Sequence, residues 1–185
     1  MKKIILFIIV SIILCACKSN DLHTTNYFSS VTIDTLLQDK ISIRALLIDK
    51  EKIWYAADQS RFGCIDLKSN QKKEIQIPAD KNREYRSIAQ TKEHIFILSV
   101  ANPALLYRIS KKDLSYELVY QETHEKVFYD SMQFWNDMEG IAIGDPIEGV
   151  FSLLKTIDGG KTWEKTPAKL LPKLVDGEAA FAASN

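Results

Sequence analysis

The chain has 185 residues with 24 basic and 24 acidic side chains, so its formal net charge is zero. This balance excludes the proteins that bind nucleic acid through a basic field, and those that carry an acidic tail. Aromatic residues make up 10% of the chain, enough for most of it to fold rather than stay disordered.

The first sixteen residues have the layout of a secretory signal peptide. Lys2 and Lys3 give a positive start, and residues 4–14 are apolar except for Ser11. This run is shorter than the roughly 20 apolar residues of a membrane-spanning helix, whereas it suits a signal peptide. The alternatives for this segment are an ordinary signal that is cleaved with no lipid attached to the mature protein, and a membrane anchor that is not cleaved.

The next motif is Leu14-Cys15-Ala16-Cys17, which resembles the lipobox of bacterial lipoproteins, with Cys15 as a mild departure from the usual small residue. The resemblance implies cleavage after Ala16 and lipidation of Cys17. Several acyl chains hold a protein on a bilayer far better than one. We therefore expect an exported protein, lipid-anchored to a bacterial membrane and facing the periplasm or the surface. The polar residues 17–30 would form its tether.

The residue types found in cofactor and metal sites do not cluster. Three histidines are scattered without metal-ligand spacing, and no nucleotide-binding fingerprint is present. After loss of the signal and lipidation, Cys64 is the only free cysteine, which excludes an intramolecular disulfide. We expect no metal, no cofactor and no nucleic-acid partner.

Residues 31–185 have the pattern of an all-β domain built from repeats. Short apolar runs alternate with turn residues. Three segments resemble one another, and Arg44, Arg86 and Asp130 superimpose at intervals of 42 and 44 residues. Each copy contains four expected strands, which is the size of a propeller blade. The sequence therefore predicts a partial β-propeller; a β-sandwich with accidental spacing is the alternative.

The expected blades lie at about residues 41–78, 85–123 and 127–172, and a fourth first strand begins at 178–185. Propellers close with typically four to eight blades. Three blades leave two exposed flanks, so either the natural protein carries further blades or copies of this chain assemble into a ring, and we expect the first.

The turn at residues 156–163, with sequence TIDGGKTW, is the most informative segment. Asp158 can accept hydrogen bonds from backbone N–H groups that follow it, and glycines adopt positive φ without penalty. The segment resembles the Asp-box, or BNR repeat, Ser/Thr-x-Asp-x-Gly-x-Thr-Trp. The pattern is matched at Thr156, Asp158, Gly160, Thr162 and Trp163.

The Asp-box resemblance implies a propeller in which the box joins the third and fourth strands of a blade. The superfamily includes sialidases, sortilin-type receptors and photosystem II stability/assembly factors. A closer resemblance, carried by residues 126–163 and 170–185 and covering nearly the whole mature chain, is to exported propellers of the Bacteroidetes type. These are described as photosystem assembly factor-like, glycosyl hydrolase or oxidoreductase. The resemblance implies a structural role on the outer rim for Asp158. It leaves the activity open, because one fold hosts many functions.

The candidate ligand-binding residues are Arg44, Arg86, Asp130 and Asp145. The first three begin the expected first strands, which line the central channel of a propeller. Two guanidiniums that face inward suit a carboxylate or sulfate ligand. Asp145, with Asp137 and Glu139 nearby in sequence, is a candidate acid for glycoside hydrolysis, which uses a carboxylic pair. Solvated or mutually paired side chains are the alternative.

Two functions from different classes fit these features. The first is a non-enzymatic binding or assembly module for a protein or glycan ligand. The second is a sialidase-like glycoside hydrolase, a type that needs three arginines and a Tyr–Glu pair. The third copy has Asp130 where a third arginine would lie. We therefore favour the binding module.

Lipidation is tested with the variant Cys17→Ser, which removes the sulfur that accepts the lipid. We expect this variant to leave the membrane fraction or to stay unprocessed. Mass spectrometry that finds an unmodified Cys17 at the start of the mature wild-type protein would end this hypothesis.

Overall fold

The structure is a computed structural model that describes residues 28–77, 82–175 and 177–180. The expected signal peptide, Cys17 and the end of the expected fourth strand lie outside these residues. The chain divides into two units, residues 1–35 and 36–185, and the fold described below is that of the second unit. In the part of the chain that the structure describes, no helix is long and apolar enough to cross a membrane.

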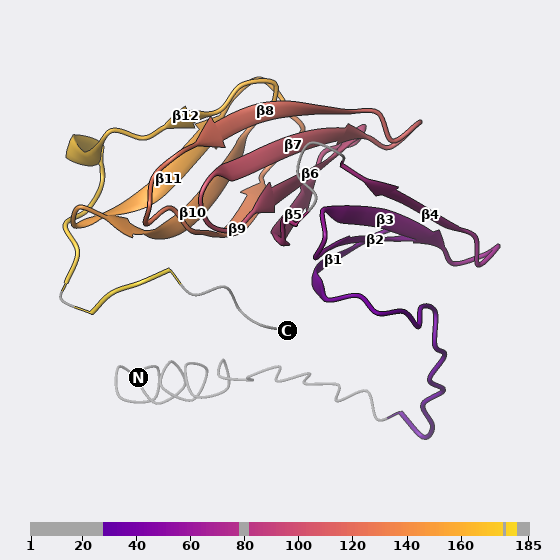
Figure 1. Cartoon of the computed structure of the whole chain (residues 1–185). Coiled ribbons are helices and arrows are strands. Elements are labelled where there is room, and N and C mark those ends of the chain that lie inside the picture. The colour runs from indigo at the N-terminus through magenta and orange to yellow at the C-terminus, as the bar shows by residue number, and fades with distance from the viewer. Residues whose placement is uncertain (1–27, 78–81, 176, 181–185) are drawn as a thin grey trace, which may run out of the picture. The chain divides into compact units, whose positions relative to one another are not determined.

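Three four-stranded antiparallel sheets make up the second unit, each built from consecutive strands (Figure 1). Blade 1 contains β1 (Ile43–Asp49), β2 (Lys52–Ala57), β3 (Arg61–Asp66) and β4 (Lys72–Gln76). Blade 2 contains β5 (Tyr85–Gln90), β6 (His94–Ser99), β7 (Ala104–Ser110) and β8 (Tyr116–Glu122). Blade 3 contains β9 (Tyr129–Phe134), β10 (Gly140–Ile147), β11 (Val150–Thr156) and β12 (Glu164–Lys165), and a short 3-10 helix follows at Ala168–Leu170.

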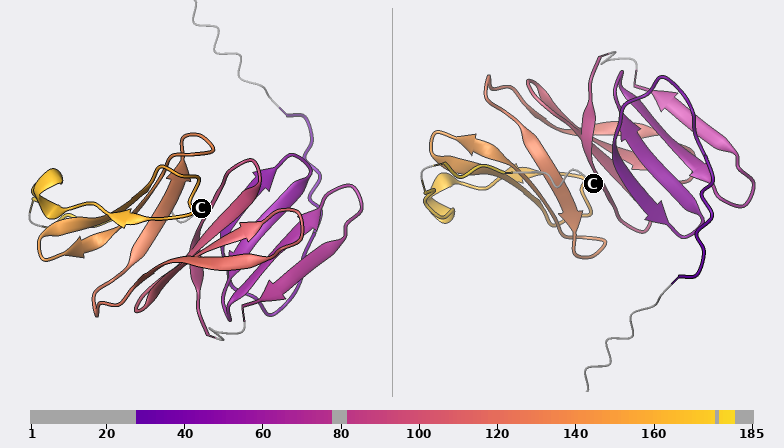
Figure 2. Two further views of the ribbon diagram at one scale, coloured as in Figure 1. Left: turned by 90° about the horizontal axis from the view of Figure 1, so that it is seen from above. Right: turned by 90° about the horizontal axis from the view of Figure 1, so that it is seen from below.

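The sheets lie side by side in chain order, with blade 2 in the middle (Figure 2). The first strand of each blade contacts the first strand of the next, β1 with β5 and β5 with β9. Strands that meander outward from such neighbouring first strands form the blades of a β-propeller. The predicted all-β fold with three four-stranded blades is therefore confirmed.

Apolar side chains fill the space between neighbouring blades. One cluster joins blade 1 to blade 2 and includes Trp54, Phe62, Tyr85 and Ile97. A second joins blade 2 to blade 3 and includes Phe96, Phe134 and Trp163. The middle sheet, blade 2, is therefore apolar on both faces, as expected for a layer packed between two others.

Phe96 of blade 2 is the centre of the second cluster. Its ring is fully buried and stacks on Phe134 of blade 3 with centroids 4.6 Å apart. Trp163 makes T-shaped contacts with both rings. A Cβ on Gly160 would lie 2.2 Å from the Phe96 ring, so this glycine allows the turn of blade 3 to approach blade 2. Its φ of 74° also favours glycine.

The first strand of every blade is interrupted at the same place. One residue has no opposite partner in the register with the second strand, and this residue is Arg44 in β1, Arg86 in β5 and Asp130 in β9. Such β-bulges redirect a side chain and occur often beside functional sites. The three residues that the repeat aligns are thus also equivalent in the structure.

Candidate functional site

The first strands have two ends that differ in chemistry. The three bulges lie at the beginning of these strands, and the tight turns that lead into the second strands lie at the other end. The end with the bulges is termed the bulge rim and the end with the turns is termed the hairpin rim. The four candidate ligand-binding residues predicted from the sequence all lie at the bulge rim.

The two arginines of the bulge rim have different surroundings. Arg44 Nε lies 3.3 Å from Glu84 Oε1 of the next blade, and both side chains are partly exposed. The Arg86 guanidinium lies over the ring of Phe128, also of the next blade, at 5.4 Å from its centroid. None of the carboxylates that the structure describes forms an ion pair with Arg86. Arg86 therefore has donors available for an anionic group.

The two acids of the bulge rim are less accessible. Asp130 is only 6% exposed, so its carboxylate lies within the blade rather than on an open surface. Asp145 is unmatched in the register between β10 and β11. Its Oδ1 accepts a hydrogen bond from Ala180 N at 3.1 Å, and its own N–H donates to Phe128 O. The bulge rim thus combines one available guanidinium with carboxylates that are paired, bonded or buried.

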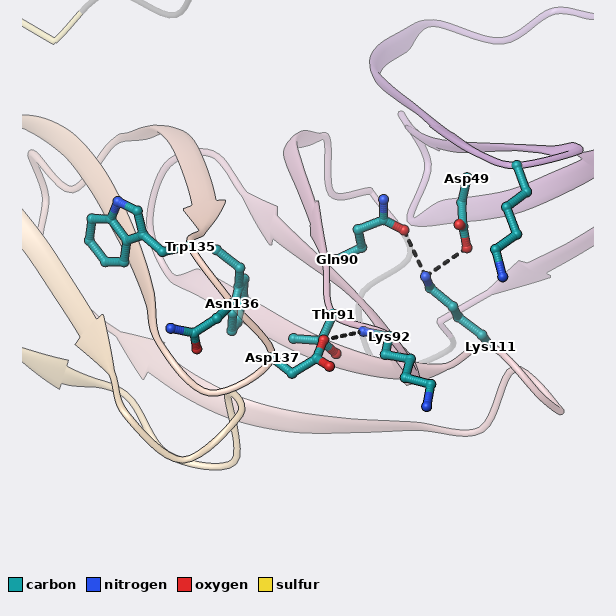
Figure 3. A pocket seen from close by; sticks show the side chains of 10 residues that line it. Asp49, Gln90, Thr91, Lys92, Lys111, Trp135, Asn136 and Asp137 are labelled. Carbon is teal, nitrogen blue, oxygen red and sulfur yellow. Dashed lines mark hydrogen bonds and ion pairs between the residues drawn. The ribbon is translucent and has the colours of Figure 1, made fainter.

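The hairpin rim surrounds a hollow of about 310 Å³. The first turns of the three blades line it together with Lys111. Lys111 Nζ donates to Asp49 Oδ2 and Gln90 Oε1, each at 2.7 Å, and so links blade 2 to blade 1 (Figure 3). Lys92 N donates to Asp137 Oδ1 and so links blade 2 to blade 3. Sequence reasoning missed this hollow because its residues come from three different blades.

The candidate acids for glycoside hydrolysis do not form a pair across β10. Glu139 precedes β10 at the hairpin rim and Asp145 lies near its end, so the strand separates them by roughly 20 Å at about 3.3 Å per residue. Asp137 lies on the same side as Glu139. Glycosidases hold their two carboxyl groups about 5–9.5 Å apart. This geometry does not support Asp145 and either of the other acids as the carboxylic pair of a glycosidase.

Two tyrosines of different blades bond to one glutamate, which the sequence did not reveal. Tyr120 Oη and Tyr129 Oη donate to Glu122 Oε2 at 2.9 and 2.7 Å, and Lys165 Nζ of blade 3 contacts Glu122 Oε1. Burial alone would raise the pKa of Glu122, but these hydrogen bonds hold it below its ordinary value. The cluster thus joins the outer strand of blade 2 to blade 3.

The phenols of this cluster are held in their neutral form. Burial raises the pKa of Tyr120 and Tyr129, and the bonds to Glu122 raise it further. The pKa of Tyr55, which donates to Glu74 in blade 1, is raised for the same reasons. These three hydroxyls therefore act as neutral hydrogen-bond donors to the carboxylates of Glu122 and Glu74.

The turn between β11 and β12 is closed by the Asp158 carboxylate. Oδ1 accepts hydrogen bonds from Lys161 N, Thr162 N and the Thr156 hydroxyl at 2.9–3.1 Å, and Oδ2 accepts one from the Thr162 hydroxyl at 2.7 Å. Asp66 and Asp113 accept similar bonds in the corresponding turns of blades 1 and 2. The turn lies at the hairpin rim, away from the arginines, and its hydrogen bonds are local except that of Gly159 N to Met138 O at 2.9 Å in the turn between β9 and β10. The identification of this turn as an Asp-box remains a prediction from the sequence.

The fold is similar to that of solved structures with low sequence identity. No protein-family model matches the chain, and no curated protein matches it either. A structure of YCF48 bound to a D1 peptide matches with a TM-score of 0.53 and 12% identity, over 68% of this chain and 39% of that chain. U3-55K matches with a TM-score of 0.54 and 13% identity, over 71% of this chain and 41% of that chain.

The WD40 repeats of RRP9 match with a TM-score of 0.54 and 13% identity, over 70% of this chain and 40% of that chain. The chain therefore spans about two fifths of the length of these structures. At this level of identity the similarity establishes the fold alone. The class of the protein is thus a partial β-propeller.

The structural role of Asp158 is tested with the variant Asp158→Ala. Burial alone would raise the pKa of Asp158, but its hydrogen bonds lower it to about 2. We expect a loss of about 1–3 kcal/mol in the free energy of unfolding, because several backbone donors lose their acceptor. The ionised carboxylate stabilises the fold at every pH above its ordinary pKa of 3.8. This contribution falls as the pH approaches 2, so the two proteins should converge there.

Thermal and urea unfolding across this pH range measure the effect, with Glu164→Ala as the control because Glu164 is exposed on the adjacent strand β12. Equal stability of Asp158→Ala and the wild type at neutral pH would contradict the structural role.

Proposed function

We propose that this chain is an exported, lipid-anchored propeller module that binds a protein or peptide ligand through Arg86 at the bulge rim. The proposal is supported by the position of the Arg86 guanidinium, which lies at a β-bulge over the Phe128 ring and has no ion pair with any described carboxylate. The guanidinium group has five donors that match a carboxylate in two parallel hydrogen bonds. Arg86 would hold a carboxylate of the ligand in this way.

Arg44 contributes less than Arg86 to the proposed site. Its contact with Glu84 keeps one guanidinium close to the rim but already partnered. A ligand carboxylate would compete with Glu84 for Arg44, whereas Arg86 binds without breaking an ion pair. Binding therefore depends more on Arg86 than on Arg44. Asp145 and the buried Asp130 would position the backbone around the site rather than contact an acidic group.

A protein ligand is consistent with what is bound in one of the solved structures that share the fold. One of them, YCF48, was solved with a D1 peptide bound. Propellers present loops at the ends of a rigid assembly of sheets, and such loops often carry binding residues. A glycan ligand is the other candidate from the sequence, and the separation of Asp145 from Asp137 and Glu139 along β10 favours binding over hydrolysis.

The proposal that the chain is anchored to a membrane is supported by its sequence. The motif at residues 14–17 resembles a lipobox, and the polar residues 17–30 that follow are suited to a tether. Export through this route would place the module in the periplasm or at the surface.

The role of Arg86 is tested with an array of immobilised short peptides of varied sequence, presented both with free carboxyl ends and with amidated ends. We expect Arg86→Ala to weaken binding to peptides with free carboxylates by about tenfold or more, because a hydrogen bond to a charged group contributes about 1.5–3 kcal/mol. Arg44→Ala should have a smaller effect, and Arg86→Lys should not restore the two-bond contact.

The matched control is Lys112→Ala, which removes an exposed positive charge from the turn between β7 and β8 at the hairpin rim. Equal binding by wild type and Arg86→Ala would contradict the proposed site. Binding to a glycan array that is lost in Arg86→Ala would replace the peptide ligand by a glycan.

A further inference from the structure

The hollow at the hairpin rim is lined by cations that the packing of the blades does not use. Lys50 lies in the turn between β1 and β2, and Lys92 lies in the turn between β5 and β6. Both are exposed and both line the hollow of about 310 Å³. Neither ammonium group forms an ion pair with a carboxylate in the part of the chain that the structure describes. Two neighbouring blades therefore each bring an unpaired positive charge to one cavity.

The acids beside these two lysines already have partners. Asp49 Oδ2 accepts a hydrogen bond from Lys111 Nζ at 2.7 Å. Glu51, which shares the turn with Lys50, forms an ion pair of 2.6 Å with Lys68. Each of these pairs is neutral as a whole, so the charges of the two lysines at the hollow remain uncompensated.

The wall that blade 3 contributes differs in charge. Asp137 Oδ1 accepts the backbone N–H of Lys92 at 2.6 Å, whereas Oδ2 accepts no hydrogen bond from a described residue. The side chain of Lys92 extends away from Asp137 (Figure 3). Three lysines and two aspartates are among the described residues that line the hollow, which leaves one net positive charge. The hollow is thus positive toward blades 1 and 2 and presents a free acceptor on blade 3.

This arrangement suits a different anion from the one proposed for Arg86. A lysine ammonium is a compact charge with three donors, and pairs of such groups bind the tetrahedral oxygens of a phosphate or sulfate. The free Asp137 Oδ2 repels a second anion but accepts a hydrogen bond from a hydroxyl group. The volume lies at the lower end of the range for small-ligand pockets. The ligand should therefore be small, anionic at one end and hydroxylated at the other.

We propose that the hollow binds a sugar that carries a phosphate or sulfate ester. The ester group lies between Lys50 and Lys92, and a sugar hydroxyl donates to Asp137 Oδ2. The lysines that hold the anion belong to blades 1 and 2, which pack on each other within this chain. The site is at the opposite end of the first strands from Arg86, so the inference is independent of the proposed peptide ligand.

The test is a calorimetric titration of the purified protein with glucose-6-phosphate, glucose-6-sulfate, inorganic phosphate and glucose at constant ionic strength. The protein carries Arg86→Ala, which removes the guanidinium at the bulge rim and keeps this result separate from the test of the proposed function. We expect both esters to bind, and glucose to bind about tenfold or more weakly, because it lacks the charged group. Glucose-6-phosphate should also bind more tightly than inorganic phosphate, since it alone reaches Asp137.

The double variant Lys50→Asn/Lys92→Ala removes both ammonium groups and should weaken binding of the esters by about tenfold or more. Asparagine tolerates the φ of 55° at position 50, and Lys92→Ala keeps the backbone N–H that Asp137 accepts. Lys112→Ala is the matched control, because it removes an exposed charge at the same rim that does not line the hollow. Circular dichroism with a cooperative melt shows that each variant is folded.

The variant Asp137→Asn changes binding in the opposite direction. Its amide oxygen can still accept the N–H of Lys92, but the negative charge beside the site is gone. We expect inorganic phosphate to bind about threefold or more tightly, and glucose-6-phosphate to lose its advantage over it. No binding of either ester, no effect of Lys50→Asn/Lys92→Ala, equal binding of phosphate and glucose-6-phosphate, or weaker phosphate binding by Asp137→Asn would each overturn the proposal.

Discussion

The contact between neighbouring sheets determines most of what this chain can do, and Phe96 shows how that contact is made. A sheet with apolar residues on both faces is stable only when both are covered. Phe96 projects from blade 2 onto Phe134, and Trp163 packs against both rings. Because Gly160 has no side chain, the turn between β11 and β12 lies against the Phe96 ring. The most recognisable motif of the sequence is therefore part of the packing between blades.

Packing of this kind places different chemistry at the two ends of the first strands. The bulges direct Arg44 and Arg86 toward residues of the next blade at one end. The tight turns, linked by Lys111 and Lys92, surround a hollow at the other. Both ends lie on sheets that are fixed by their buried faces, so a ligand at either end meets preorganised side chains and binds at a lower entropic cost.

The sequence was sufficient to predict the fold and to identify part of the candidate site. A period of 42–44 residues and alternating apolar runs predicted three four-stranded blades, and the intervals between Arg44, Arg86 and Asp130 corresponded to equivalent bulges. The bulges themselves could not be predicted, because a single unpaired residue leaves no trace in the apolar pattern. Burial of Asp130 and the ion pair of Arg44 depend on neighbouring blades, which the local sequence does not specify.

The contacts between blades are the main feature that the sequence did not predict. Glu122 and Lys165 are 43 residues apart, and nothing in the sequence near either one indicates that they meet. The distance between Glu139 and Asp145, in contrast, could have been anticipated, since they flank an expected strand and must lie near its two ends. Sequence reasoning therefore succeeded within blades and failed between them.

The packing of blade 2 on blade 3 is measured most directly by a double-mutant cycle between Phe96→Leu and Phe134→Leu, with Phe62→Leu of blade 1 paired with Phe134→Leu as the control. The stacked rings predict a coupling of about 1 kcal/mol in the free energy of unfolding between the first pair. The control pair should be additive within about 0.5 kcal/mol. Additive effects of Phe96→Leu and Phe134→Leu would show that the two sheets do not pack through these rings, and would contradict the propeller arrangement described above.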